Sequence, residues 1–338
     1  MSRIVRNVLL LSLATLGGPG TGYAQGVRRL PEHDRVRLAE AFRLAEAVRP
    51  AVWPGWERTP MPVLLVTDST EFLIGHPEPS PEFSSLGRDP LLEREVHSRA
   101  RRFPATLLAT FPAVAGRSTI VVGSAARTGK SSGEWALTLL HEHFHQWQSS
   151  LPGYHARAAG LGLASGDTTG QWMLDYPFPY DSAPVQRAVS DLAASLADAL
   201  RAPADAGTDT SRALAADRDR LRRLLSPDDH RYLEFQLWQE GVPRFVELAA
   251  AEAAGRSGPP AAAFRDLPDY VPYAELAARM RLGMEAELEA MSLARERRTG
   301  FYTLGAGLAL LLQRTRPDWK DHYARRPFEL AELPGPAR

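Results

Sequence analysis

A helix with one buried face is predicted near the middle of the chain. Ser131 and Glu134 have the spacing of a capping box, and a Leu-Pro-Gly turn at 151–153 provides a stop signal. Between these boundaries, apolar residues recur at helical spacing: Leu137, Leu140, Phe144 and Trp147. The pattern therefore predicts a helix whose apolar stripe faces the core.

The apolar pattern divides the rest of the chain into a mixed part and a helical part. Residues 31–48 have helical periodicity, whereas the apolar runs at 61–68 and 118–123 are typical of buried strands. Residues 107–114 fit a strand except at Pro112, and residues 76–89 fit a loop. After a loop-like aromatic stretch at 151–183, helices are predicted over five segments: 184–201, 211–225, 226–254, 272–297 and 300–313.

This order of elements predicts an α+β fold in a single domain, residues 25–338. A small α/β lobe with a short sheet, residues 25–150, ends in the helix described first. A mainly helical lobe, residues 151–338, follows it.

The central helix carries the clearest chemical motif, H-E-x-x-H. His141 and His145 are four residues apart, so both imidazoles lie on one face of a helix and can bind the same zinc ion. Glu142 then lies where a general base for a zinc-activated water is needed. His143 is about 200° around the helix from His141 and should not bind that metal. The alternative is a histidine-rich patch without a metal.

Composition limits which ligands and partners are available. The 338 residues include 40 basic and 40 acidic side chains, so the formal net charge is zero. This balance gives no electrostatic reason to expect nucleic acid or an anionic membrane surface as a partner. The chain has no cysteine, so histidine and carboxylate must supply any zinc ligands.

The N-terminus has the pattern of a secretory signal peptide. Arg3 and Arg6 precede an apolar run at 8–16, and a small-x-small cleavage site ends at Ala24. We expect cleavage after Ala24, which would give a secreted or periplasmic protein without stable membrane insertion. An uncleaved anchor is the alternative.

A catalytic zinc usually has three protein ligands, so a third one must come from outside the helix. The candidates downstream of the motif are histidines and acids: His155, Asp175, His230, Glu234, Glu240 and Glu247. His155 is close in sequence but lacks a glycine turn that would return it to the metal. His230 lies at a probable helix start, where capping explains its acidic neighbours.

Three motifs, in this order, resemble those of the aminopeptidase-N-like gluzincins, a family of zinc peptidases. They are H-E-x-x-H-Q-W at 141–147, W-x-E-G-x-x-R-F-x-E at 238–247 and F-Y-T-L-G-A at 301–306. The resemblance implies a zincin-like fold and one zinc ion. In the family, the glutamate before the glycine is the third zinc ligand, which corresponds to Glu240. The tyrosine of the third motif stabilises the oxyanion, which corresponds to Tyr302.

The chain also departs from the family pattern. The interval from His145 to Glu240 is 95 residues, longer than is usual in the family, and Gln239 and Leu304 replace the family's asparagine and lysine. The exopeptidase motif G-x-M-E-N is absent upstream of the helix, and so is the family's large N-terminal β domain. The metal chemistry therefore carries over more directly than aminopeptidase specificity does, and the choice between internal and terminal cleavage stays open.

Pro243 lies inside the second motif and constrains the local structure. Proline is tolerated in the first turn of a helix, so we expect a helix to begin near residues 240–242. Glu240 would then lie near the positive end of that helix. Glu247, seven residues later, would share its face and could orient a ligand histidine.

Taken together, these features predict a secreted zinc peptidase that acts on a peptide or protein substrate, with Glu142 as general base. The strand at 118–123 could offer a backbone edge to an extended peptide. Two alternatives remain: a zinc hydrolase of a non-peptide acyl substrate, and a metal-free secreted binding protein with a degenerate site.

Overall fold

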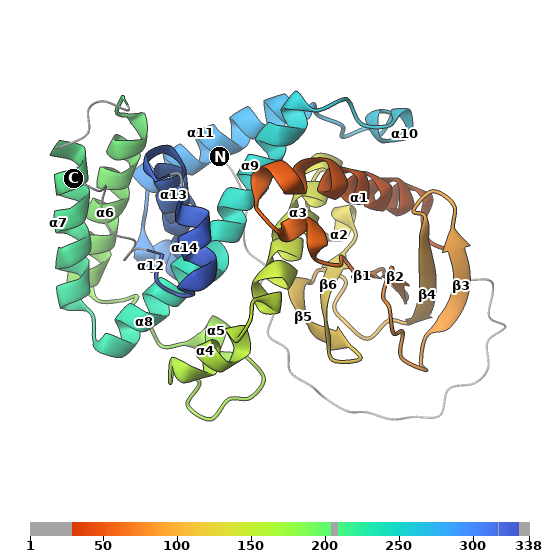
Figure 1. The fold of residues 1–338 in the computed structure, drawn as a ribbon, viewed down its shortest axis with the longest axis horizontal. Helices are drawn as coiled ribbons and strands as arrows, with labels where there is room; N and C mark the ends of the chain where they lie inside the picture. Colours follow the sequence, from red (N-terminus) through yellow and green to blue (C-terminus); the bar gives the residue numbers. More distant parts are fainter. Residues whose placement is uncertain (1–28, 204–208, 317, 331–338) are drawn as a thin grey trace. The chain divides into compact units, whose positions relative to one another are not determined.

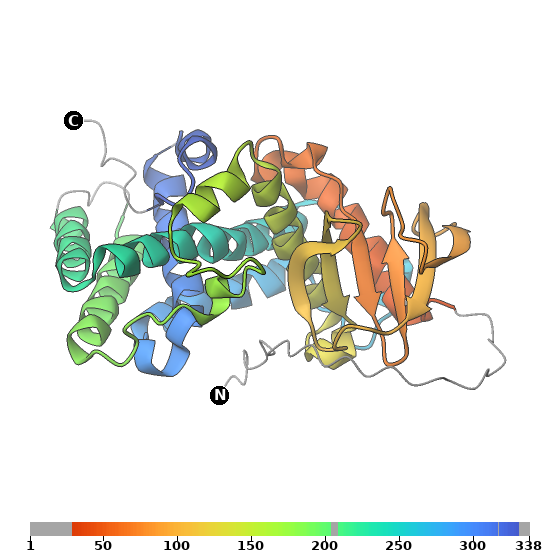
Figure 2. The ribbon, with the colours of Figure 1, turned by 90° about the horizontal axis from the view of Figure 1, so that it is seen from below.

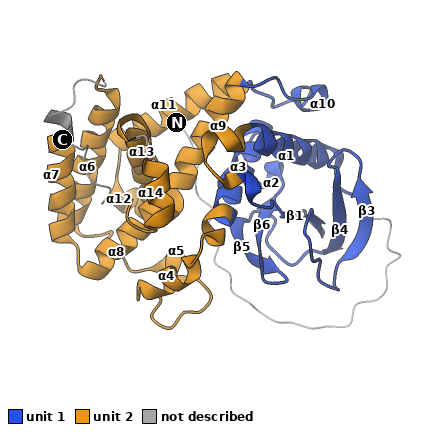
Figure 3. Ribbon diagram, in the orientation of Figure 1, with its two compact units in different colours: residues 1–47, 57–146, 257–272 blue, residues 48–56, 147–256, 273–338 orange. Residues whose placement is uncertain are grey.

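The computed structural model describes residues 29–203, 209–316 and 318–330 and has an α+β fold (Figure 1). The predicted signal peptide, residues 1–24, lies outside the described residues. No helix in the described part of the chain is long and apolar enough to cross a membrane. By density of contacts the chain divides into two units, which are coloured separately in Figure 3. The first comprises residues 1–47, 57–146 and 257–272, and the second residues 48–56, 147–256 and 273–338.

A six-stranded mixed sheet forms the centre of the first unit. Its strand order is β3-β4-β2-β1-β6-β5, with β1 and β6 parallel and all other neighbours antiparallel. The strands are β1 (Val63–Val66), β2 (Thr70–Ile74), β3 (Ser84–Asp89), β4 (Arg94–Ala100), β5 (Leu108–Val114) and β6 (Arg117–Gly123). The predicted strands at 61–68 and 118–123 are confirmed as β1 and β6. The loop predicted at 76–89 is wrong at its end, where mostly exposed polar residues form β3.

Side chains alternate between the two faces of this sheet, as the pleat requires. Val63 and Leu65 of β1 join a core with two helices, α1 (Glu32–Val52) and α3 (Ser132–Ser150), so both helices cover the same face (Figures 1 and 2). Leu64 and Val66 join a second core on the opposite face, formed with Leu107 and its neighbours rather than with helices. The β1 run is therefore buried on both sides, which explains why its sequence is continuously apolar.

β5, and not β6, lies at the edge of the sheet beside α3. β6 pairs with β1 on one side and β5 on the other, so the expectation that residues 118–123 offer a free edge is wrong. β5 runs through Pro112 with a register shift between Phe111 and Val114. Proline lacks an N–H and is tolerated at edges and bulges, so this position resolves the ambiguity of residues 107–114 in favour of a strand.

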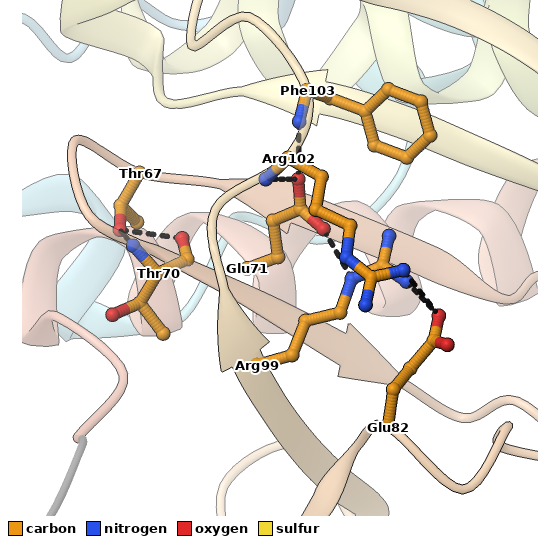
Figure 4. Close-up of polar contacts among 7 residues, drawn as sticks. All are labelled: Thr67, Thr70, Glu71, Glu82, Arg99, Arg102 and Phe103. Atoms are coloured by element: carbon orange, nitrogen blue, oxygen red, sulfur yellow. Dashed lines mark hydrogen bonds and ion pairs between the residues drawn. The ribbon is translucent and has the colours of Figure 1, made fainter. Parts of the chain in front are cut away.

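A buried carboxylate fixes the segment that leads into β5 (Figure 4). Glu71 is fully buried, and one of its oxygens accepts hydrogen bonds from the backbone N–H groups of Arg102 and Phe103 at 2.7 and 2.6 Å. Its other oxygen accepts from Nε of Arg99 at 2.6 Å, and Arg99 also pairs with Glu82. The buried charges are thus paired and hydrogen-bonded, as burial requires.

Helices make up the second unit, and most follow the predicted boundaries. The long ones are α6 (Ala183–Arg201), α7 (Asp209–Leu224), α8 (Pro227–Gln236), α9 (Val242–Arg256), α11 (Tyr273–Glu289) and α13 (Gly300–Thr315). The aromatic stretch at 151–183 includes two short helices, α4 (Tyr154–Gly160) and α5 (Trp172–Asp175). Phe178 and Tyr180 from that stretch are buried and contact Phe301, which is packing within the unit.

The remaining helical segments are short. They are η1 (Trp56–Arg58), α2 (Ala125–Thr128), η2 (Leu237–Gly241), α10 (Ala262–Arg265), α12 (Leu293–Glu296), η3 (Arg297–Thr299) and α14 (Trp319–Arg325). Of these, η2 and η3 carry residues of the candidate centre described below.

Candidate metal centre

The capping box predicted for the central helix is present at the start of α3. The Ser131 N–H donates to the Glu134 carboxylate at 2.9 Å, and the Glu134 N–H reaches the Ser131 hydroxyl oxygen at 3.4 Å. Trp135 Nε1 donates to the carbonyl of Gly123 at 2.8 Å, which ties the first turn to the end of β6. These contacts fix the position of the H-E-x-x-H turn relative to the sheet.

The two histidines of the motif have the geometry of paired zinc ligands. His141 and His145 are 8% and 9% exposed, and their Nε2 atoms are 3.2 Å apart. Two nitrogen ligands of a tetrahedral zinc ion, each about 2.05 Å from the metal, are about 3.3 Å apart. The spacing of the two Nε2 atoms therefore fits a metal ion held between them.

His143 is turned away from this pair, as its place on the helix predicts. It is fully buried, and its Nδ1 lies 2.8 Å from Oε1 of Gln146. The Gln146 amide in turn donates to the carbonyls of Pro62 and Ser118, at 3.2 and 3.0 Å. His143 and Gln146 therefore anchor α3 to the ends of β1 and β6 and do not contribute ligand atoms.

Thr110 of β5 contacts Glu142, and no sequence pattern connects these two residues. Its hydroxyl lies 2.8 Å from Oε2 of Glu142 and 2.9 Å from the Glu142 carbonyl, so its single proton can be donated to either oxygen. Glu142 is 6% exposed. The edge strand thus supplies one hydrogen bond that orients the candidate base.

Glu240 lies in a widened, π-helical turn, η2, which joins α8 to α9 without a break. The expected helix start near residues 240–242 is confirmed, because α9 begins at Val242 with Pro243 in its first turn, but α9 continues directly from η2. Pro243 has no N–H to donate to the carbonyl of Gln239 four residues earlier, and this carbonyl accepts from the Gln148 amide at 3.2 Å. The π-helical turn and the hydrogen bond from Gln148 together accommodate Pro243 in the helix. Widened turns of this kind are frequent at functional sites.

A close backbone contact brings α13 to this turn. A Cβ atom added at Gly241 would lie 2.4 Å from the Cα of Gly305, so η2 and α13 meet where neither has a side chain. Trp238 is fully buried, stacks on Tyr323 with centroids 4.4 Å apart, and fixes the other side of the turn. Both glycines belong to the motifs quoted above, and this contact explains why each motif contains one.

The contact places Tyr302 and Arg298 beside Glu240. Arg298, in η3, donates from Nη1 to the Tyr302 hydroxyl at 2.7 Å, and the same nitrogen is 3.6 Å from Oε1 of Glu240. Burial and the Glu240 charge raise the pKa of Tyr302 well above its usual value, which keeps the phenol protonated and able to donate. Burial alone would lower the pKa of Arg298, but Tyr302 and Glu240 raise it overall. Arg298 was not among the residues predicted from the sequence, although its position one helical turn before Tyr302 could have indicated it.

One group of histidine and acidic side chains among the described residues could hold a metal ion. It consists of His141, His145 and Glu240, and one ligand atom from each lies within 4.8 Å of the others. Two imidazole nitrogens and a carboxylate oxygen are a donor set that suits zinc, although they do not by themselves fix the identity of the metal.

The other candidates for third ligand are not in this group. The carboxylate of Glu247 instead accepts from Nη1 of Arg244 at 2.8 Å, an interaction between neighbouring turns of α9. His155 contacts the ring of Tyr154, and Asp175 accepts from the amide of Gln171.

Comparisons with known proteins found no match: neither a protein family nor a curated protein matches the sequence, and no solved structure matches the fold.

Proposed function

We propose that this chain is a zinc-dependent metallohydrolase of gluzincin type, with a zincin-like fold, and that it hydrolyses peptide bonds. The observation that carries the proposal is the grouping of His141, His145 and Glu240 with Glu142, which follows the first histidine in α3. A mixed sheet with an antiparallel edge strand beside that helix adds support.

The side chains around this group suit the steps of amide hydrolysis. When bound, zinc polarises the scissile carbonyl and makes water acidic enough to react near neutral pH. Glu142 accepts the proton of the attacking water and delivers it to the leaving amine, while the Thr110 hydroxyl orients its carboxylate. Tyr302 donates a hydrogen bond to the developing oxyanion.

An extended peptide fits this arrangement because β5 pairs with a neighbour on one side only in the described sheet. Its outer backbone groups, next to Thr110, would pair with the peptide main chain. We further propose that residues 1–24 direct the chain out of the cytoplasm, so that its peptide or protein substrates are extracellular or periplasmic.

Metal analysis and the Glu142→Gln variant test the proposal. We expect about one zinc ion per chain in both proteins, because glutamine leaves the three ligands intact. We expect kcat against a mixed peptide library to fall by about 10²–10⁴-fold, because the amide cannot accept the proton. Glu57→Gln, an exposed position in η1, is the control and should keep full activity.

Each other outcome has a definite meaning. A protein without stoichiometric zinc would be a metal-free binding protein, and the proposal would be wrong. Zinc binding with turnover of small amides but not of peptides would indicate a non-peptide acyl substrate. Full activity in Glu142→Gln would remove Glu142 as the base.

A further inference from the structure

Arg298 is a buried cation with unused hydrogen-bond donors. It is 8% exposed, and the contacts described above engage only its Nη1. Within the described part of the chain, Nε and Nη2 donate to no protein group, and neither is among the buried unpaired nitrogens, so both reach solvent. Three of the five N–H groups of this guanidinium are therefore available to a ligand.

Arg99 shows how this protein pairs a buried arginine when the role is structural. Arg99 is 5% exposed and donates from Nε to Glu71 and from Nη1 to Glu82, so two carboxylates face it. Among the described residues, Arg298 forms an ion pair with one acidic side chain, Glu240, at 3.6 Å. A buried charge is costly unless it is paired and hydrogen-bonded, and Arg298 satisfies this condition less well than Arg99.

The pairing of Arg298 weakens further once Glu240 serves the metal. A carboxylate that binds zinc shares its charge with the ion, so less of it is left to compensate the guanidinium. The Tyr302 hydroxyl accepts a hydrogen bond from Nη1, but a phenol carries no charge near neutral pH and does not replace a carboxylate. In the described part of the second unit, Arg298 is therefore a buried cation whose acidic partner, Glu240, would be shared with the metal.

We propose that Arg298 binds a carboxylate of the substrate, close to the scissile bond, through its Nε and Nη2 groups. This edge of a guanidinium matches the two oxygens of a carboxylate. The inference rests on the proposed function, because Tyr302, which contacts Nη1, marks where the reacting carbonyl would lie. One residue spans at most about 3.6 Å, so the carboxylate belongs to the residue next to the cleaved bond.

Two sources of such a carboxylate exist: the α-carboxylate of a C-terminal residue and the side chain of Asp or Glu. The first would make the protein a carboxypeptidase, and the second would make it selective for acidic residues. The test uses three peptides: acetyl-Ala-Phe-Ala with a free C-terminus, the same peptide with a C-terminal amide, and acetyl-Ala-Phe-Glu-amide.

Binding is measured by calorimetry on zinc-loaded Glu142→Gln protein, so that the readout does not depend on turnover. We expect one of the two carboxylate peptides to bind at least about tenfold more tightly than the neutral amide, the usual size of a charge-assisted hydrogen bond. Arg298→Gln should remove this preference, and Arg298→Lys should keep part of it. Arg297→Gln, at the exposed neighbour that pairs with Asp181, should leave it unchanged.

Equal binding of all three peptides would overturn the inference, as would a preference that survives Arg298→Gln. If Arg298→Gln weakens all three peptides by the same factor, Arg298 acts only by positioning Tyr302, and the inference is wrong. Failure of the proposed function is recognised separately, by absence of bound zinc or of peptide cleavage in the wild-type protein. Bound zinc and cleavage without a carboxylate preference would reject the inference alone.

Discussion

The residues of the candidate centre come from two regions that are built in different ways. His141, Glu142 and His145 lie within five consecutive residues of α3, whereas Glu240, Arg298 and Tyr302 are spread over 63 residues in η2, η3 and α13. In the first region, helix geometry alone places the two imidazoles on one face. In the second region, a π-helical turn and the contact between Gly241 and Gly305 position the side chains.

This difference has a consequence for sensitivity to mutation. The α3 region depends on its cap and on contacts with the sheet, which can weaken without moving the histidines relative to each other. The second region depends on a few non-local contacts, so a small change there displaces a ligand or a donor.

Replacement of Glu240 by Ala should cause the largest loss. It removes the carboxylate ligand, and we expect the zinc affinity to fall by more than about 100-fold, since even partners that only orient ligands cost 10–100-fold. A titration against a zinc-binding dye measures this affinity. Glu252→Ala, which removes a surface pair with Arg281, is the control. Unchanged affinity in Glu240→Ala would mean that the third ligand lies elsewhere.

Replacement of Tyr302 by Phe should lower kcat by about 10²–10³-fold with little change in KM, because the lost hydroxyl acts on the transition state. Steady-state kinetics with zinc-saturated protein measure both constants. Tyr270→Phe, in the first unit, should leave them unchanged. A loss confined to KM would assign Tyr302 to substrate binding rather than to the oxyanion.

Replacement of Thr110 by Val tests the support of the α3 region. Valine keeps the shape but removes the hydrogen bond to Glu142, so we expect kcat to fall by about 10–100-fold, the value of a hydrogen bond to a charged group. Thr110→Ser restores the hydroxyl and should recover most of the activity. Thr119→Val in β6, where the hydroxyl donates to the carbonyl of Arg117, is the matched control. If Val and Ser variants lose activity equally, the effect is one of packing.

Replacement of Asp269 by Asn should have the smallest effect, on stability alone. The Asp269 carboxylate accepts from the N–H and hydroxyl of Ser132, both at 2.7 Å, at the start of α3. Burial raises its pKa, but the bonds from Ser132 outweigh burial and leave the pKa below its usual value. Its stabilisation is therefore present above about pH 4 and lost as the pH falls below that value.

We expect Asp269→Asn to reduce the free energy of unfolding by about 1 kcal/mol at pH 7, the usual value of a helix cap. Urea unfolding at pH 7 and pH 3 measures this, and the difference from wild type should shrink at pH 3. Asp266→Asn, an exposed position after α10, is the control. A difference that persists at pH 3 would show that the charge of Asp269 is not responsible.

The α3 region was predictable because each of its signals is local. Ser131 and Glu134 cap the helix, the apolar stripe gives its buried face, and the spacing of His141 and His145 sets the face of the ligands. What the sequence missed there was the contact of Glu142 with Thr110, which lies 32 residues earlier. Pro112 obscured the strand pattern around Thr110, because a proline in an edge strand has the same sequence signal as the end of a strand.

In the second region, the quoted motifs indicated Glu240 and Tyr302 but not how they meet. Pro243 marks the start of α9 as expected, but the sequence did not indicate that the Gln148 amide supplies the hydrogen bond that the proline cannot make. Gln148 is 91 residues from Gln239 in sequence, and no local pattern connects them. The position of Arg298 next to Glu240 likewise depends on the contact between Gly241 and Gly305.

The sequence by itself determined the helix that carries H-E-x-x-H, the helical character of the second half, and the kind of ligand that a chain without cysteine can offer. The tertiary structure alone decided which strand is at the edge, how Pro243 is accommodated, and that Arg298 faces Glu240 and Tyr302. The physical reason is the sequence separation over which each interaction acts. Helix caps and apolar periodicity act within a few residues, whereas the contacts of Arg298 with Glu240 and of Gln148 with the Gln239 carbonyl form only when the folded chain brings distant segments together.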